Sequence, residues 1–138
     1  MKKLLSGIAM TCTLSLLLLL SDCADHTLAP LVIKTLPFTS GITFKVEVTA
    51  LGDKPVTEYG IVYTAYFRAS QDPHILDPTI NNSKIIFPAP FQLGTSEYLY
   101  PTDFFQGRTF FYYRAYAIQN DGSVAYGNRI GYRFPDPF

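Results

Sequence analysis

An alternation of apolar and polar residues over positions 42–50 is the feature that most restricts what this chain can fold into. Every second residue is apolar and the residues between are polar: Ile42, Phe44, Val46, Val48 and Ala50 against Thr43, Lys45, Glu47 and Thr49. A period of two residues predicts a β-strand that buries one of its faces. The chain therefore contains at least one strand of a sheet that covers a hydrophobic core.

The rest of the chain beyond residue 23 repeats this strand character and lacks a helical period. The sequences LGDKP (51–55) and QNDGS (119–123) have the residues of tight turns, and Asp121-Gly122 favours a hairpin. Proline-rich sequence around the 84–87 segment confines it to a sheet edge. About seven strands joined by turns predict an all-β, antiparallel sandwich. The expected strands are 31–36, 42–50, 56–67, 84–87, 96–100, 109–118 and 124–134.

The same alternation assigns side chains to the two faces of the last strands. If Phe111, Tyr113, Ala115 and Ala117 face the core, together with Ile130, Tyr132 and Phe134, their neighbours point outward. The outward set is an exposed patch of tyrosine and arginine, residue types enriched at interfaces, which could bind a protein or a carbohydrate. The alternative is that these side chains only stack on one another across the strands. The set comprises Tyr112, Arg114, Tyr116, Arg129 and Arg133.

The N-terminus has the features of an export signal. Lys2 and Lys3 precede an apolar segment over 4–20, and no cluster of Lys or Arg follows it, so a cleaved signal is favoured over a retained membrane helix. Cys12 would leave with that segment, and Cys23 would be the one cysteine of the mature chain. An exported protein usually pairs its cysteines, so a lone one favours attachment of lipid over a free thiol.

The residues LSDC at 20–23 resemble the lipobox of bacterial lipoproteins. In that group a peptidase cuts before the cysteine, which carries a diacylglyceryl group. The resemblance implies a signal peptide over 1–22, a lipid on Cys23, a tether over 23–30 and one domain over 31–138. Asp22 stands where the group usually has Gly, Ala or Ser. Ala24 differs from the aspartate that retains enteric lipoproteins at the inner membrane, so outer-membrane anchoring is expected, with the periplasmic or the external side left open.

Three pieces of the domain, VTEYGIVYT (56–64), FFQGRTFFYYRAYAIQNDG (104–122) and VAYGN (124–128), resemble the fibronectin type III-like domains of surface lipoproteins in Bacteroidota. The resemblance implies a fibronectin type III/immunoglobulin-like sandwich used as a spacer, an adhesive module or a carbohydrate-associated module. Phe111 falls where such domains place a tyrosine that holds a corner of the fold, so packing alone or a neighbour such as Tyr112 would replace it. The segment 107–117 is one residue longer than the pattern, which predicts a β-bulge there.

Charge and motif content argue against several other classes of function. Removal of Lys2, Lys3 and Asp22 from a chain with eleven basic and eleven acidic residues leaves nine and ten, so nucleic acid is not an expected partner. The two histidines, His26 and His74, fall in the tether and in a loop, and the motifs of hydrolases, phosphate-binding loops and zinc sites are missing. We therefore expect no enzyme activity and no cofactor.

One loop offers a weak metal-binding possibility and a second candidate for recognition. Asp72, His74 and Asp77 lie close together in DPHILD, but polar residues are common beside prolines in loops, so no metal is expected. The irregular stretch 68–90 is long, and long loops on rigid scaffolds often contain residues that bind a partner.

The function that the sequence favours is a lipid-anchored binding, adhesion or structural module. The alternative is a carbohydrate-binding accessory protein of an outer-membrane glycan uptake system, and an enzyme ranks third.

Overall fold

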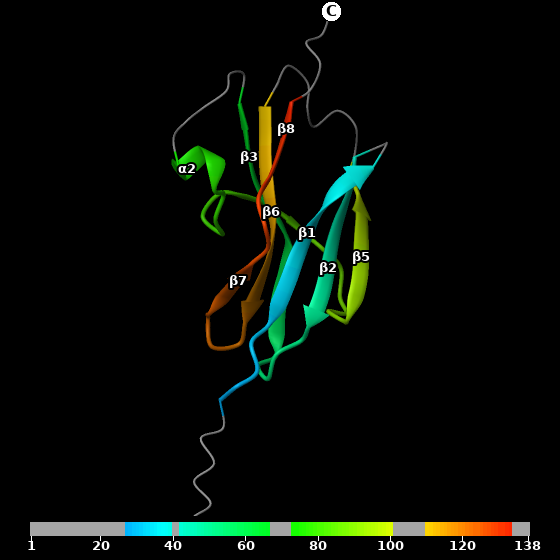
Figure 1. The fold of residues 1–138 in the computed structure, drawn as a ribbon, viewed down its shortest axis with the longest axis vertical. Helices are drawn as coiled ribbons and strands as arrows, with labels where there is room; N and C mark the ends of the chain where they lie inside the picture. The colour runs from blue at the N-terminus through cyan, green and yellow to red at the C-terminus, as the bar shows by residue number, and fades with distance from the viewer. Residues whose placement is uncertain (1–26, 40–41, 67–72, 101–109, 134–138) are drawn as a thin grey trace, which may run out of the picture.

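The computed structural model describes residues 27–39, 42–66, 73–100 and 110–133, which form an antiparallel β-sandwich with one helical turn (Figure 1). The predicted fold class is confirmed. The predicted signal peptide, Cys23, Asp22 and His26 lie outside the described residues, as do Asp72, Thr109 and Phe134. Along the described parts of the chain, no helix is long and apolar enough to cross a bilayer. The elements are β1 (Val32–Thr39), β2 (Thr43–Ala50), β3 (Val56–Tyr66), α2 (Pro73–Leu76), β4 (Ser83–Ile86), β5 (Gly94–Leu99), β6 (Phe110–Gln119), β7 (Val124–Tyr126) and β8 (Ile130–Arg133).

The strands divide between two sheets. The smaller sheet has the order β1-β2-β5, and the larger has β4-β3-β6-β7, with β8 also paired to β6. The first, second and fifth strands on one side and the third, sixth and seventh on the other match the partition of immunoglobulin-like sandwiches. The two layers lie face to face, and the first described residues before β1 lie at the opposite end of the sandwich from the end of β8 (Figure 1). The edge positions predicted for the first strand and for the 84–87 segment are confirmed by β1 and β4.

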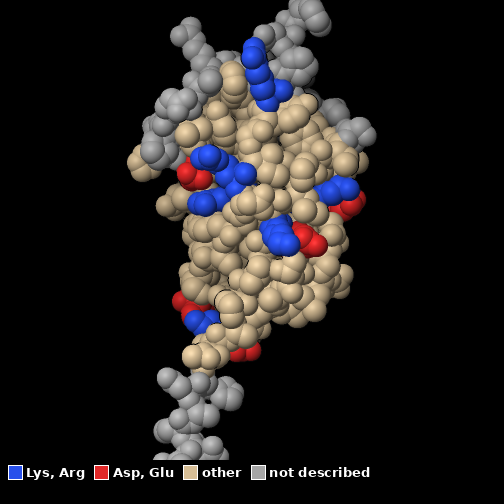
Figure 2. All heavy atoms as spheres, viewed as in Figure 1, with Lys and Arg blue, Asp and Glu red and all other residues tan. Residues whose placement is uncertain are grey.

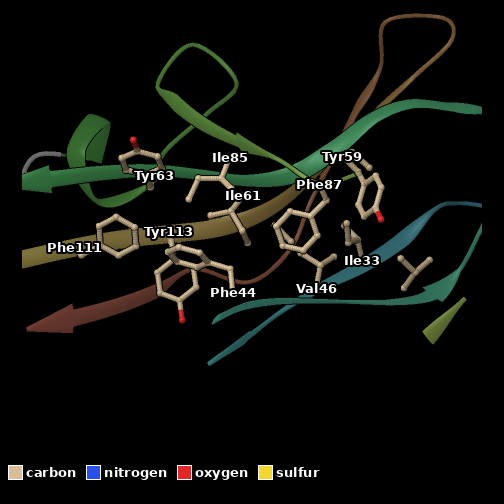
Figure 3. Packing of buried hydrophobic residues seen from close by; sticks show 13 residues of the cluster. Ile33, Phe44, Val46, Tyr59, Ile61, Tyr63, Ile85, Phe87, Phe111 and Tyr113 are labelled. Carbon is tan, nitrogen blue, oxygen red and sulfur yellow. The ribbon is translucent and has the colours of Figure 1, made fainter. Parts of the chain in front are cut away.

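The core lies between the two sheets, as the alternation of apolar and polar residues predicted. Aromatic rings dominate it: Phe44 of β2 lies 5.4 Å from Tyr113 and 5.8 Å from Phe111 of β6, measured between ring centroids. Figure 3 shows these rings packed between the layers, beside Ile61 and Tyr63 of β3. The inward faces expected for 42–50 and for Phe111, Tyr113, Ala115 and Ala117 are thereby confirmed. The buried cluster is Ile33, Phe44, Val46, Val48, Tyr59, Ile61, Tyr63, Ile85, Phe87, Phe111, Tyr113, Ala115 and Ala117.

One expectation about β6 is wrong over the described part of the strand, and a second is refined. Its register with β3 runs without a shift from Tyr66 opposite Phe110 to Glu58 opposite Ile118, so there is no bulge over 110–117, and residues 107–109 lie outside the described part. The irregularity lies in β3 instead, between Val56 and Glu58. The hydroxyl that ties the sheets belongs to Tyr113 and not to Tyr112: it accepts a hydrogen bond from the Phe38 N–H (3.2 Å) and donates to the Leu36 carbonyl (3.4 Å). Burial raises the pKa of Tyr113 to about 12, which keeps this donor protonated.

The last predicted strand, 124–134, is interrupted and forms β7 and β8. The hairpin expected at Asp121-Gly122 is present, since Gly122 has φ of 83° and its N–H donates to the Gln119 carbonyl. After Tyr126 the chain leaves the ladder, while the Gly127 N–H still donates to the Ala115 carbonyl at 2.9 Å. The prediction of one continuous strand over 124–134 is therefore wrong. The pattern of residues within a strand says nothing of a contact with a distant strand, and β1 makes such a contact between β7 and β8.

Thr35 of β1 makes that contact and joins the two sheets. Its N–H donates to Asn128 Oδ1 (3.0 Å), and its buried Oγ1 accepts the Ala115 N–H (2.8 Å). Gly127 permits the approach, because a Cβ there would lie 2.8 Å from the Thr35 nitrogen and 2.7 Å from its Oγ1. The Thr35 hydroxyl oxygen thus supplies the acceptor that the ladder of an uninterrupted strand would offer to the Ala115 N–H.

Thr35→Val is expected to lower the free energy of unfolding by about 1–3 kcal/mol, because the buried Ala115 N–H loses its acceptor at nearly constant side-chain volume. Urea unfolding followed by circular dichroism measures this loss. Thr35→Ser retains an acceptor oxygen and should restore part of the stability, and Thr95→Val on the exposed surface of β5 should change it little. Equal stability of Thr35→Val and Thr95→Val would contradict the role of Thr35.

Candidate functional site

The predicted tyrosine and arginine patch maps to the outer face of the larger sheet, defined as the side chains of β4, β3, β6, β7 and β8 that point away from the core. Tyr112, Arg114 and Tyr116 alternate with core residues along β6. Arg133 lies opposite Phe110, and Gly131 lies opposite Tyr112, so the outward set on β8 joins that on β6. Arg129 lies one residue before β8. The structure therefore brings the five residues to one face, as their alternation indicated.

Tyr116 is nevertheless buried, contrary to the expected exposed patch. It is 0% exposed, and it lies between Gly60 of β3 and Tyr126 of β7 in the sheet register. Its hydroxyl donates to Glu58 Oε1 at 2.8 Å, and burial together with this carboxylate raises the pKa of Tyr116. A ligand cannot stack on its ring in this arrangement, because neighbouring strands and side chains already cover it.

Glu58 also binds Lys84, and this three-residue network was not anticipated from the sequence. Lys84 Nζ lies 2.8 Å from Glu58 Oε1, and the same nitrogen lies 5.9 Å from the centroid of the Tyr116 ring. The hydrogen bonds from Lys84 and Tyr116 hold the pKa of Glu58 below its ordinary value. The outward parity of Glu58 on β3 was predictable, but its pairing with β4 needed the strand order.

Arg114 binds the backbone of the long loop. Its Nε donates to the Pro78 carbonyl at 2.6 Å, and its guanidinium carbon lies 4.0 Å from the centroid of the Tyr126 ring. Stacking on an aromatic face and a charge-assisted hydrogen bond together hold the planar guanidinium in one orientation. The half-buried Arg114 therefore has its Nε donor and one face of its guanidinium engaged by the protein itself.

The segment 73–82 is the part of the long loop that covers the outer face, and we call it the cover segment. Thr64 of β3 donates its hydroxyl to the Ile75 carbonyl at 2.5 Å, and the Ile80 N–H donates to the Tyr126 hydroxyl at 3.0 Å. Pro78 is fully buried between these contacts. In Figure 1 helical turn α2 lies against the outside of the sheet that contains β3 and β6. The two surfaces considered as separate recognition sites are thus packed against each other.

The cover segment also has its own local order. Asn82 Oδ1 accepts the Thr79 N–H at 2.7 Å, and the Asn82 N–H donates to the Thr79 carbonyl at 2.9 Å. These bonds close a turn that leads directly into β4. The prediction of an irregular stretch over 68–90 is therefore refined: over its described part it contains a helical turn, a closed turn and an edge strand.

The remaining members of the predicted patch are more exposed. Arg129 Nη1 lies 3.4 Å from Asp77 Oδ2, a solvated pair that contributes little free energy. The Arg133 guanidinium carbon lies 5.6 Å from the Phe110 ring centroid. Tyr112 is half-buried, and a Cβ on Gly131 would lie 3.0 Å from its ring, so the ring lies across β8 at Gly131. These contacts agree with the cross-strand stacking that was the alternative to a ligand patch.

The loop residues considered for metal binding do not converge where the structure describes them. Asp77 is engaged with Arg129, and His74 lies exposed in α2. Within residues 27–39, 42–66, 73–100 and 110–133, no group of three His, Cys, Asp or Glu side chains could hold an ion.

Comparisons of the chain with protein-family models, with curated proteins and with solved structures gave no match.

Proposed function

We propose that the protein is an exported lipoprotein, anchored to the outer membrane through lipid on Cys23, whose single β-sandwich serves as a structural or binding module of the cell envelope. The proposal is supported by the way in which the N-terminal segment joins the sandwich. Ala29 N–H donates to Asp53 Oδ2 at 2.6 Å, and the Asp53 N–H donates to the Ala29 carbonyl at 3.3 Å. The chain is therefore attached to one end of the domain six residues after the proposed lipid site.

The closed outer face supports a module that acts as a rigid unit. Three hydrogen bonds, from Thr64, Arg114 and Ile80, join the cover segment to the sheet. The Arg114 Nε and the Tyr116 hydroxyl, which a sugar-binding patch would have used, are bonded within the domain. This arrangement favours a structural or protein-binding module over the carbohydrate-binding alternative. The lipobox-like residues 20–23 and the lone mature cysteine support the anchor.

The anchor can be tested by metabolic labelling of the full chain with a palmitate analogue in a bacterium that processes lipoproteins. The wild-type chain is expected to incorporate the label, and Cys23→Ala is expected to lose it entirely, because a thioether needs the Cys23 sulfur. Cys12→Ala is the matched control, since Cys12 is the only other cysteine and lies in the segment expected to be removed. Equal labelling of wild type and Cys23→Ala would refute the proposal.

Two additions sharpen this experiment. Asp22→Ser places a small residue before the cysteine, and it should raise the fraction of cleaved, labelled chain if Asp22 slows the peptidase. Protease treatment of intact cells, followed by detection of the labelled fragment, assigns the domain to the external or the periplasmic side. Digestion only after the outer membrane is opened would place the domain in the periplasm.

A further inference from the structure

One end of the sandwich exposes aliphatic side chains around the point where the N-terminal segment is attached. We call it the tether end, defined by the turn 51–55 and the residues 89–93 beside it. Leu28, Leu51 and Leu93 are 56%, 41% and 58% exposed, and Ala89 and Pro90 between them are also exposed. A hollow of about 540 Å³ lies here, lined by residues 51–56 and by Ala89, Pro90 and Phe91. Exposed aliphatic side chains gathered at one place indicate a surface that is covered in use.

The charged side chains at the tether end make hydrogen bonds within the domain, and two of them form an ion pair. The Asp53 carboxylate accepts the Ala29 N–H, and Lys54 Nζ lies 2.5 Å from Asp121 Oδ2. Hydrogen bonds from Lys54 and Ser123 hold the pKa of Asp121 below its ordinary value, so this carboxylate stays ionised near neutral pH. In Figure 2 the lower end of the molecule is mostly tan, with blue and red atoms side by side on it and red atoms at its lowest part. A partly apolar end whose charged side chains bond within the domain suits an interfacial environment.

The length of the tether restricts what can cover this end. Five residues, 24–28, separate Cys23 from the fixed Ala29, and a fully extended chain spans at most about 3.3–3.6 Å per residue. Ala29 therefore stays within about 20 Å of the lipid-bearing residue. The headgroup layer of a leaflet is only about 5–8 Å thick. A domain held so closely has its tether end beside the bilayer.

We propose that the tether end rests on the lipid surface, with Leu51 and Leu93 at the boundary between headgroups and acyl chains. This inference depends on the proposed lipidation of Cys23. The apolar area is too small for stable binding from solution, but the anchor makes the contact intramolecular, so a weak contact is populated. The anchor and the exposed side chains together orient the sandwich upright, with the opposite end directed away from the membrane.

Single tryptophan reporters test the contact, because the chain has no tryptophan of its own. Leu51→Trp and Leu93→Trp are placed at the tether end. Leu99→Trp is the control, since Leu99 is 67% exposed and lies at the other end of β5 from Leu93. Each full-length lipidated variant is reconstituted in phosphatidylcholine vesicles whose acyl chains carry bromine, a quencher of tryptophan emission. Leu51→Trp and Leu93→Trp are expected to lose most of their emission, whereas Leu99→Trp should keep its emission.

Flotation of the same vesicles separates the two proposals. A variant that does not float with lipid is not anchored, which overturns both the anchor and the contact. Variants that float but keep full emission at 51 and 93 overturn the contact alone, and equal quenching of all three reporters would mean that the domain lies on its side. The tryptophan emission of Leu51→Trp could instead be blue-shifted in isolated envelopes and unquenched in the vesicles. That result would assign the tether end to a protein partner and overturn the lipid contact. Two reporters are used so that poor folding of either variant leaves the other to decide.

Discussion

Gly60→Ala is expected to lower the free energy of unfolding by at least about 3 kcal/mol, as the sum of an unfavourable backbone conformation and an overlap that the neighbouring strand cannot relieve. Gly60 has φ of 156°, and a Cβ built on it would lie 2.0 Å from the Ile85 carbonyl oxygen and 3.1 Å from the Phe87 nitrogen. Both are backbone atoms next to the β3 and β4 pairing. The two strands must therefore separate, or β3 must move against β6.

Gly122→Ala is the matched control for this substitution. Gly122 also has positive φ, at 83°, but nothing lies within 4 Å of the position its Cβ would take. It should cost only the strain of a left-handed alanine, about 1–2 kcal/mol. Urea unfolding of both variants, followed by circular dichroism, measures the difference. If the two substitutions cost the same, the close approach of β4 to Gly60 is not present in solution.

Phe44→Ala is expected to lower the free energy of unfolding by about 3–5 kcal/mol, a large share of the 5–15 kcal/mol typical of a domain. Phe44 is fully buried at the centre of the core, and its ring touches residues of both sheets: Phe38 lies at 5.9 Å and Tyr113 at 5.4 Å between centroids. Removing the ring leaves a cavity that two packed layers cannot close, because each layer is held by its own hydrogen-bonded ladder.

Leu99→Ala provides the comparison, because Leu99 is largely exposed and its loss should change stability by no more than about 0.5 kcal/mol. The expected signature of Phe44→Ala is a lower urea midpoint at an unchanged slope, which means lost stability without a change in the surface exposed on unfolding. A loss no greater than that of Leu99→Ala would show that the ring is not enclosed between the sheets.

The closed outer face has a consequence for how a partner could be recognised. The Arg114 Nε cannot meet a ligand unless the cover segment leaves the sheet, since it binds the Pro78 carbonyl, and the Tyr116 ring stays covered by its strand neighbours and by the Glu58–Lys84 pair. Recognition on this side is then available to the exposed Arg129 and Arg133 and to the outer surface of the cover segment. Substitutions of Tyr116 should therefore act on stability first and on binding only through it.

The faces of the strands were predictable because successive side chains of a β-strand point to opposite faces of its sheet. Phe111, Tyr113, Ala115 and Ala117 follow this period without interruption, and all four are fully buried. The hairpin at Asp121-Gly122 was predictable for a similarly local reason, since a glycine can take the positive φ that the turn needs. These features depend on neighbours in the chain and hence on information that a single sequence contains.

The exposure of an outward side chain was not predictable in this way. Tyr116 points away from the core as expected, but Gly60 and Tyr126 flank it and the Glu58–Lys84 pair closes over it. Likewise, the break between β7 and β8 follows from Thr35, a residue about ninety positions earlier, which binds Asn128 and Ala115. Alternation says which side of a sheet a residue lies on, but not what covers that side.

The sequence by itself determined the fold class, the edge strands, the inward faces and the hairpin, because strand periodicity and turn chemistry act over a few residues. The tertiary structure alone decided that Tyr113 joins the sheets, that Thr35 interrupts the last strand, and that the cover segment closes over Arg114. Each of these rests on a hydrogen bond between segments distant in the chain. Such bonds form only once both sheets are in place and a buried polar group needs a partner.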